Sequence, residues 1–316
     1  MSPRKCRSVA RLRVSLVMAV LALGAALGTA PGSAAAGDDP FDVRIGLALG
    51  SGGAGGLAHI AMLEVFDELG HKPARITGTS IGAVVGALYA AGLTPDEIRE
   101  LFKDFGGSAL DPLSGLGNDN SGPGWTDLLD IDFDEGSLIS SDGFIELIAE
   151  RFQAREFSEL DIPLKIVATD YWSGEAVVLD QGELLPAIQA SMAVPGLFAP
   201  VEHDGKLLID GGASNPLPWD LLDENDLKVA IDVTGTRARD SDDKPGLTDL
   251  LFKSFEIMQQ SIIREKRRAG EPDIYIKPDL SDVRLLHFDR VDAIIESATG
   301  AQDELREQLG QALKRK

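Results

Sequence analysis

The sequence is poor in cysteine and, beyond its first residues, in long apolar runs. Cys6 is the single cysteine among 316 residues. A mature chain that begins after it has no thiol, which excludes disulfides, thiol catalysis and cysteine-bound zinc or iron–sulfur centres. Apart from VSLVMAVLALGAALGTA near the N-terminus, no segment of the sequence has the length and apolar character that crossing a bilayer requires.

Positive charge is scarce as well. The chain has 30 Lys and Arg against 51 Asp and Glu, which gives a formal net charge of −21. An acidic surface repels phosphate-rich partners, so we expect neither nucleic-acid binding nor adhesion to anionic lipid. Transient contact with a neutral or zwitterionic membrane surface remains compatible with this charge.

A secretory signal peptide is predicted at residues 1–36. MSPRKCRSVARLR contains five basic residues and no acid, the apolar stretch follows, and GSAAAG offers an Ala-x-Ala cleavage site ending at Ala36. Its removal takes the net charge to −26 (−21 − 5). An uncleaved anchor is the alternative, which is disfavoured because the apolar stretch is slightly short for a span. We therefore expect an exported protein, periplasmic or secreted.

Residues 37–316 predict one α/β domain, because strand-like and helix-like segments alternate along them. Such alternation is typical of a mainly parallel sheet covered by helices on both faces. The expected strands lie at 43–49, 74–77, 164–170, 175–180, 206–210, 228–234 and 273–279. The expected helices lie at 57–69, 83–92, 94–102, 184–191 and 247–268.

Two segments have open interpretations. Residues 106–136 are rich in Gly, Asp, Asn, Ser and Pro, which is typical either of a mobile lid or of an irregular surface excursion. In the helix from Leu247, apolar residues recur at helical spacing, and we expect this stripe to pack on the core rather than to dock on a membrane. The stripe consists of Leu250, Leu251, Phe255, Met258 and Ile262.

A glycine-rich segment, GSGGAGG, lies between the first strand and the first helix. Such a segment presents backbone amides to an anion, either a nucleotide phosphate or the oxyanion of a reacting ester. Gly50, Gly52 and Gly55 fit the dinucleotide spacing, but HKPARITGTS lacks the acidic residue expected about 20 positions further on. The sequence also lacks the Gly-Lys-Ser/Thr ending of a P-loop, so the oxyanion interpretation is favoured.

GTSIG, residues 78–82, fits the nucleophile-elbow pattern Gly-x-Ser-x-Gly. In that motif the serine occupies a strained turn between a strand and a helix, and both elements are expected around Ser80. A small-residue turn that only packs a helix on a sheet is the alternative. We therefore identify Ser80 as a candidate nucleophile.

A serine nucleophile needs a base, because its hydroxyl is a poor nucleophile at its ordinary pKa. A histidine in the chain order common among α/β-hydrolases would be His203 or His287, and neither lies in a segment that resembles a catalytic loop. A partly desolvated carboxylate can serve instead. Asp210 is the candidate, since it ends the strand KLLID and precedes Gly211 and Gly212.

The glycine-rich loop, GTSIG and Asp-Gly-Gly, in this order, resemble the patatin-like phospholipase family. The resemblance extends through LAHIAML, ATDYWSGEAVVLDQGELLPAIQASMAVPGLFAPV and KLLIDGGASNPLP. It covers a motif core at about residues 44–218, and 219–316 form a helical and strand extension. It implies a three-layer α/β/α sandwich and a bacterial, exported serine esterase without metal or cofactor. Its expected substrate is a lipid or other acyl ester, cleaved as by a phospholipase A or lysophospholipase.

The resemblance also assigns roles by position. Ser80 would form an acyl-enzyme, Asp210 would act as its base, and the amides of Gly52, Gly53 and Ala54 would form the oxyanion hole. The remaining motif positions are Gly50, Gly55, Gly56, Gly78, Gly82, Gly211 and Gly212.

Two residues depart from the family pattern. Gly55 stands where patatin-like loops usually carry Arg or Lys, and Ser51 replaces a frequent glycine. The loss of the basic side chain leaves the amides in place, so the esterase stays the leading hypothesis, and it motivates a second one, a relative that binds lipid or a partner without turnover. For His59, one helical turn further on, we expect a packing or hydrogen-bonding role.

Overall fold

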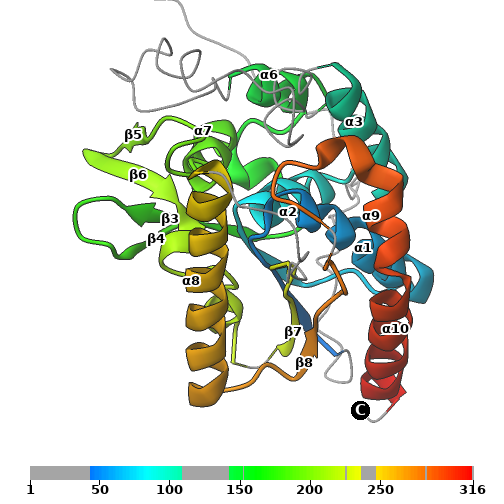
Figure 1. The fold of residues 1–316 in the computed structure, drawn as a ribbon. Helices are drawn as coiled ribbons and strands as arrows, with labels where there is room; N and C mark the ends of the chain where they lie inside the picture. The colour runs from blue at the N-terminus through cyan, green and yellow to red at the C-terminus, as the bar shows by residue number, and fades with distance from the viewer. Residues whose placement is uncertain are drawn as a thin grey trace, which may run out of the picture. The chain divides into compact units, whose positions relative to one another are not determined.

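The computed structural model describes residues 43–108, 142–151, 153–224, 226–235, 247–281 and 283–314 (Figure 1). The predicted signal peptide lies outside the described residues. Of the predicted insertion at 106–136, only 106–108 are described, as the end of helix α3 (Pro95–Ser108).

A sheet of eight strands organises the described chain, in the order β5-β6-β3-β2-β1-β7-β8, with β4 paired to β3. The parallel strands are β1 (Ile45–Leu49), β2 (Arg75–Thr79), β3 (Leu164–Asp170), β7 (Leu227–Ile231) and β8 (Ile274–Ile276). The antiparallel strands are β4 (Ala176–Leu179), β5 (Val201–His203) and β6 (Lys206–Asp210). The mainly parallel sheet is confirmed, and β7 and β8, from the C-terminal part of the chain, pair into it beside β1.

The described α-helices are α1 (Ala58–Leu69), α2 (Ile81–Ala90), α3, α6 (Asp142–Arg151), α7 (Leu184–Ser191), α8 (Leu247–Ala269), α9 (Val291–Ser297) and α10 (Thr299–Lys314). Five of them, α1, α2, α3, α7 and α8, lie where helices were predicted, although α3 extends to Ser108, and α6, α9 and α10 were not predicted. At the start of α3, the Thr94 amide donates to Glu97 Oε2 over 2.8 Å and the Glu97 amide to Thr94 Oγ1 over 3.3 Å, which completes a capping box. Among the described residues, no helix combines the length and apolar character of a membrane span.

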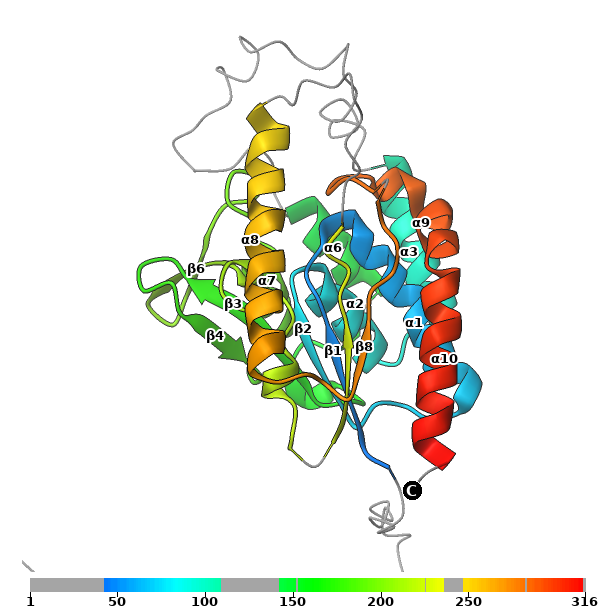
Figure 2. The same cartoon turned by 60° about the horizontal axis from the view of Figure 1, so that its bottom comes forward.

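Strand β1 shows how the sheet separates two helical layers. Successive side chains of a strand point to opposite faces, and Ile45, Leu47 and Leu49 join the larger core on the side of α1, α2 and α7. Ala48 points to the other face, into a smaller cluster that includes Ile263 of α8. Figure 2 shows α8 alone along one side of the sheet, opposite α1, α9 and α10. The three-layer α/β/α sandwich is confirmed.

The orientation of α8 differs from the prediction. Leu250, Leu251 and Met258, which were predicted to pack on the core, are 51, 58 and 55% exposed. The face turned toward the protein carries Gln259 and Ile263, each only 3% exposed. The packed face was not predicted because it contains the polar residue Gln259. Apolar periodicity alone favours the neighbouring residue, Met258, as the buried position.

Candidate active site

Ser80 occupies a strained turn between β2 and α2. Its backbone has φ 56° and ψ −125°, a conformation that residues other than glycine rarely adopt. The Ser80 amide donates to Ser191 Oγ over 2.9 Å, and Ser191 Oγ donates to the Val167 carbonyl over 2.6 Å. The predicted strand–turn–helix context is present, and a buried hydroxyl from the end of α7 supports the turn.

The glycines that flank the turn are dictated by packing. A Cβ on Gly78 would lie 2.6 Å from the Gly82 carbonyl oxygen, and one on Gly82 would lie 2.2 Å from the Leu49 carbonyl oxygen. Real Cβ atoms do not approach backbone oxygens so closely. The two glycines therefore let α2 begin directly against β1 and β2.

Sheet register brings Asp210 beside this turn. Thr79, the residue before Ser80, aligns with Val167 of β3, and the next β3 residue, Ala168, aligns with Asp210. Because β6 runs antiparallel to β3, its C-terminal residue reaches the level at which the parallel strand β2 ends. The two residues that were predicted from motifs 130 positions apart (210 − 80) are therefore neighbours across β3.

The Asp210 carboxylate is held in place and fully buried. The Asp210 amide donates to the Ala193 carbonyl over 2.9 Å, and Oδ1 accepts from the Gly212 amide over 2.6 Å. Oδ2 is buried with no partner of ordinary hydrogen-bond geometry. A carboxylate with one clamped and one unpartnered oxygen can take up a proton at a defined position.

The electrostatics of Asp210 are those of a weak base that titrates near neutrality. Burial raises its pKa to about 7, and contacts with the Ser80 side chain and the Gly212 amide oppose the shift. Ser80 therefore lies close enough to affect the carboxylate, although its bond to Oδ2 is not formed. Catalytic hydrogen bonds are often long or misaligned before a substrate binds.

The glycine-rich loop is held by three backbone bonds from distant segments. The amides of Gly50, Ser51 and Ala54 donate to the carbonyls of Ile231, Pro216 and Leu285 over 3.1, 2.8 and 2.7 Å. The Ala54 amide, which was predicted to belong to the oxyanion hole, is therefore already occupied by the Leu285 carbonyl.

The amides of Gly52 and Gly53 differ from that of Ala54. Within the described chain, neither donates to a backbone carbonyl. Gly53 has φ +55°, and a Cβ there would lie 2.5 Å from the Leu285 carbonyl oxygen. These two amides begin the short 3-10 helix Gly53–Leu57 and remain available to an anion.

Close packing surrounds the rest of the loop. A Cβ on Gly55 would lie 2.9 Å from the Val233 carbonyl oxygen and 3.2 Å from Leu280 Cδ1. The place of the family's basic side chain is therefore closed by two apolar residues. Similar close approaches occur at the other motif positions, Gly50, Gly56, Gly211 and Gly212.

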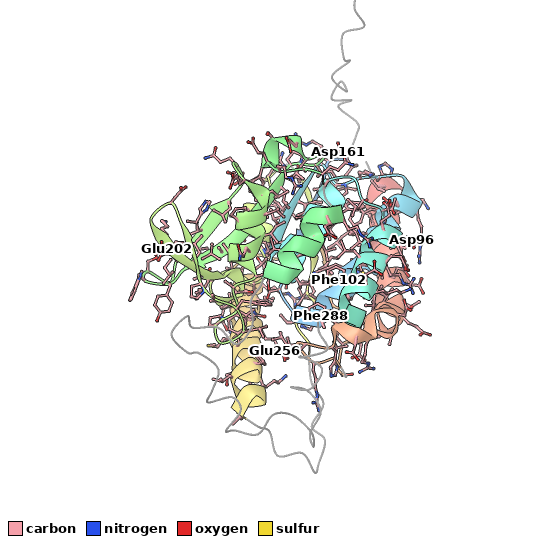
Figure 3. The ribbon with its side chains drawn as sticks, turned by 90° about the horizontal axis from the view of Figure 1, so that it is seen from above. Asp96, Phe102, Asp161, Glu202, Glu256 and Phe288 are labelled. Atoms are coloured by element: carbon pink, nitrogen blue, oxygen red, sulfur yellow. The ribbon has the colours of Figure 1, made fainter. Side chains whose placement is uncertain are left out.

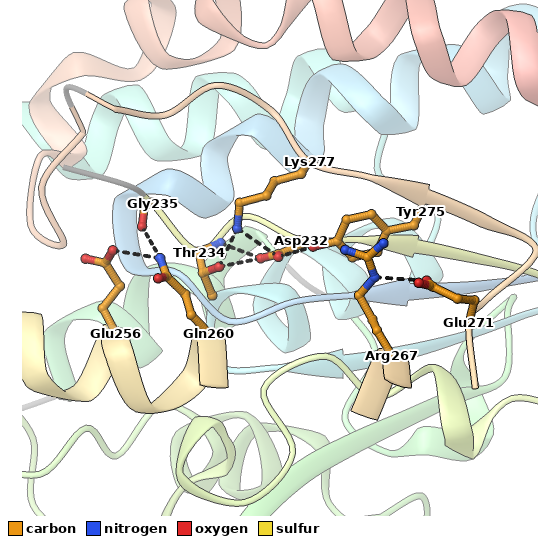
Figure 4. A network of polar contacts seen from close by, with 9 residues as sticks. All are labelled: Asp232, Thr234, Gly235, Glu256, Gln260, Arg267, Glu271, Tyr275 and Lys277. Atoms are coloured by element: carbon orange, nitrogen blue, oxygen red, sulfur yellow. Dashed lines mark hydrogen bonds and ion pairs between the residues drawn. The ribbon is translucent and has the colours of Figure 1, made fainter. Parts of the chain in front are cut away.

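A polar network centred on Asp232 holds the segment that packs on this loop (Figure 4). The buried Asp232 carboxylate accepts from the Thr234 amide over 2.9 Å and from Lys277 Nζ over 2.8 Å, and it contacts the Tyr275 hydroxyl. Val233 lies between two of these residues. The network therefore fixes the carbonyl that closes the loop around Gly52 and Gly55.

The histidines are placed outside the Ser80–Asp210 pair. His59 is buried, with Nε2 2.9 Å from the Gly50 carbonyl oxygen, and burial lowers its pKa to about 4. This neutral hydrogen-bonding role agrees with the prediction. His203 aligns with Lys206, at the end of β6 opposite Asp210, and His287 Nδ1 accepts from the Arg284 amide over 3.2 Å.

An apolar cavity opens beside Ser80. Its lining combines the Ser80 turn with side chains from the segment after α7, from α8 and from the segment before α9. Phe288, in this segment, stacks on Phe102 of α3 with ring centroids 6.3 Å apart (Figure 3). The lining residues are Ser51, Gly53, Ser80, Ile81, Met192, Val194, Leu197, Phe198, Phe255, Gln259, Leu285, Leu286 and Phe288. Such a lining suits a hydrocarbon chain better than a polar ligand.

Several site residues were not predicted from the sequence. Ser191 supports the Ser80 turn, Thr169 Oγ1 donates to the Asp210 carbonyl over 2.9 Å, and Gln259 reaches the glycine-rich loop from α8. Ser191 lies within a stretch that carries the family resemblance, so its position was a usable signal. No sequence signal pointed to Gln259, because a glutamine on an amphipathic helix is ordinarily a surface residue. In the described part of the chain, no group of three or more His, Cys, Asp or Glu is placed to hold a metal ion.

The fold and the strand–serine–helix turn indicate an α/β protein of the hydrolase type, and the comparisons specify the family. The model of the patatin-like phospholipase family matches residues 47–223, more than half of the chain. The chain belongs to the patatin-like phospholipase family.

The relatives include longer proteins. An uncharacterized NTE family protein of Mycobacterium bovis is 34% identical over 208 residues, which cover 65% of this chain and 53% of that protein. Patatin-like phospholipase domain-containing protein 7 of Rattus norvegicus is 29% identical over 279 residues, 80% of this chain and 20% of that protein. Among solved structures, VipD from Legionella pneumophila has a TM-score of 0.47 at 15% identity, covering 84% of this chain and 67% of that one. The chain spans about half the length of the mycobacterial relative.

Proposed function

We propose that this protein hydrolyses carboxylic esters of lipids through a Ser80–Asp210 dyad. One observation carries the proposal: a strained serine lies beside a buried carboxylate whose pKa is raised to about 7 and whose Oδ2 has no partner. Such a carboxylate can accept the hydroxyl proton near neutral pH without a histidine.

The reaction proceeds in two acyl transfers. Ser80 Oγ forms a bond to the ester carbonyl carbon while its proton passes to Asp210, and the carbonyl oxygen becomes an oxyanion facing the Gly52 and Gly53 amides. The oxyanion collapses, the alcohol leaves with the proton from Asp210, and an acyl-enzyme remains. Water then gives a proton to Asp210 and attacks the acyl carbon. The second oxyanion collapses, the fatty acid leaves, and Asp210 returns the proton to Ser80 Oγ, which restores the hydroxyl.

The substrate class follows from the cavity. Its apolar lining beside Ser80 suits a fatty acyl chain, and the net charge of −21 favours a neutral or zwitterionic head group over an anionic one. We therefore propose phospholipase A or lysophospholipase activity on zwitterionic lipids such as phosphatidylcholine or its lyso form.

Two variants test the dyad. Ser80→Ala and Asp210→Asn should each lower hydrolysis of lysophosphatidylcholine to the uncatalysed level while thermal unfolding remains cooperative. Fatty acid release is measured by mass spectrometry, with Ser261→Ala on α8 as a matched hydroxyl deletion. Retention of most activity in either dyad variant would contradict the assignment.

A fluorophosphonate probe separates catalysis from binding alone. If Ser80 is activated, the probe labels the wild-type protein covalently and does not label Ser80→Ala. A lipid-binding relative without turnover is not labelled in either form. Binding without turnover is the second hypothesis, and the observation behind it is that Gly55 lacks the family's basic side chain. An unlabelled, folded protein would favour it.

We also propose that the protein is exported after cleavage of residues 1–36. The support is the predicted signal peptide. N-terminal sequencing of the protein recovered from its host should give a chain that begins at Gly37. A chain recovered with residues 1–36 attached would contradict cleavage.

A further inference from the structure

Ser51 and Gln259 form a buried polar pair that the proposed dyad does not use. Both are 3% exposed. Gln259 Nε2, from α8, donates to Ser51 Oγ over 3.0 Å, and the Ser51 amide is fixed by its 2.8 Å bond to the Pro216 carbonyl. Both side chains line the apolar cavity that also contains Ser80 and Gly53.

The donor and acceptor roles in this pair leave one hydrogen unused. An amide nitrogen only donates, so Ser51 Oγ accepts the bond and its own hydrogen points elsewhere. Among the described residues, no bond takes up that hydrogen. A buried hydroxyl donor is thus directed by Gln259 within an otherwise apolar cavity.

The pair also lies against the turn that holds Asp210. A Cβ placed on Gly212 would lie 2.2 Å from Gln259 Nε2, 2.9 Å from Ser51 Oγ and 2.8 Å from Asp210 Oδ1. The Ser51 hydroxyl, the Asp210 carboxylate and the start of the glycine-rich loop therefore meet within one small volume. Only a glycine at position 212 allows α8 to reach it.

We propose that the Ser51 hydroxyl is a third donor to the oxyanion, beside the Gly52 and Gly53 amides, and that Gln259 is a positioning residue that orients it. The inference rests on the proposed function. The charge that develops on the substrate carbonyl oxygen supplies the acceptor that the resting site lacks. In this chain, a side chain thereby adds to a hole that is otherwise built from backbone amides.

The first test is the kinetics of Ser51→Ala with 4-nitrophenyl butyrate. We expect kcat to fall on the order of 100-fold with little change in KM, since a donor to the oxyanion acts mainly in the transition state. The pH midpoint of kcat/KM should stay near 7, because the Asp210 environment is retained. An unchanged kcat, or a loss that is explained by a shifted midpoint, would overturn the proposal.

Gln259 provides a second variant that does not depend on Ser51→Ala folding normally. Gln259→Glu is nearly isosteric but replaces a donor by an acceptor, so the new carboxylate captures the Ser51 hydrogen. We expect kcat to fall as far as in Ser51→Ala, whereas Ser261→Ala on the same helix leaves it unchanged. Wild-type kcat in Gln259→Glu would overturn the orienting role.

Ser80→Ala, assayed in parallel, distinguishes the two possible failures. Residual turnover in Ser80→Ala would overturn the proposed function itself. Turnover that depends on Ser80 but is unaffected by Ser51→Ala would overturn only the role of Ser51.

Discussion

Helices α2 and α8 meet at the same site but are built in opposite ways. All ten residues of α2 are buried, and its first turn is fixed by glycine contacts to β1 and β2. Helix α8 is longer, exposes several large apolar side chains, and contacts the site through Phe255 and Gln259. Ser80 is therefore positioned by close backbone packing and by the Ser191 hydroxyl, whereas the polar contact of α8 with the glycine-rich loop depends on a single side chain, Gln259.

The largest expected effect concerns Asp210, which is fully buried and whose Oδ1 accepts from the Gly212 amide. Its folded pKa of about 7 lies above the unfolded value of 3.8, so the native state binds the extra proton between these values and stability falls as pH rises. Asp210→Asn should remove this penalty and add up to about 4 kcal/mol to the free energy of unfolding at pH 8. It should add little at pH 3.

Urea denaturation of the wild type and Asp210→Asn at pH 3 and pH 8 measures this change in the free energy of unfolding. The other titrating groups contribute equally to both proteins, so their effect cancels. An equal effect of the substitution at both pH values would contradict the raised pKa. Such a result would also indicate that water reaches Asp210 more easily than its complete burial implies.

The α2 side is tested by Gly82→Ala. The added Cβ would meet the Leu49 carbonyl oxygen at 2.2 Å, and backbone cannot yield as a side chain can. We expect a loss of about 3 kcal/mol in the free energy of unfolding. Gly310→Ala in α10 is the matched control, because nothing lies within 4 Å of its Cβ, and it should gain up to about 1 kcal/mol. Similar stabilities of the two variants would show that α2 is not held by this contact.

On the α8 side, Phe255→Ala should change which acyl chain fits. Removing the ring enlarges the cavity beside Ser80, so the ratio of kcat/KM for an octanoate ester over a butyrate ester should rise about tenfold. Phe252→Ala is the control, since Phe252 lies on the same helix, packs against the core and is absent from the cavity lining. An equal change in both variants would indicate a general loosening of α8.

The smallest effect is expected at Leu251, which is 58% exposed. Leu251→Ser should change the free energy of unfolding by less than about 0.5 kcal/mol. Ile263→Ser, on the packed face of the same helix, should cost about 3 kcal/mol. Denaturation curves of the two variants compare the two faces of α8 directly. A larger loss of unfolding free energy in Leu251→Ser than in Ile263→Ser would support the orientation of α8 that apolar periodicity predicted.

The contrast between the helices also explains what the sequence could predict. The Ser80 turn, Asp210 and the glycine-rich loop depend on local rules for turns and close backbone approach, so short motifs located them. The packed face of α8 depends on which side chains the sheet and the loop after Asp210 present to it. The packed face consists of Phe252, Phe255, Gln259 and Ile263. That Gln259 is buried cannot be recognised until the position of its partner, Ser51, is known.

The occupied Ala54 amide illustrates the same limit at the level of the backbone. The motif predicted that the loop amides face an anion, and Gly52 and Gly53 keep theirs available. Whether a third amide is available depends on Leu285, a residue far along the chain in a segment without motif. The closed space at Gly55 has the same origin, since Val233 and Leu280 define it.

The loop's backbone partners have a consequence for the order of folding. The carbonyls that fix residues 50–54 belong to Pro216, Ile231 and Leu285. A chain that grows from its N-terminus therefore makes the serine motif early but cannot fix the loop until most of the polypeptide has emerged. Such long-range closure slows folding. It also keeps incomplete chains from completing the glycine-rich loop beside Ser80.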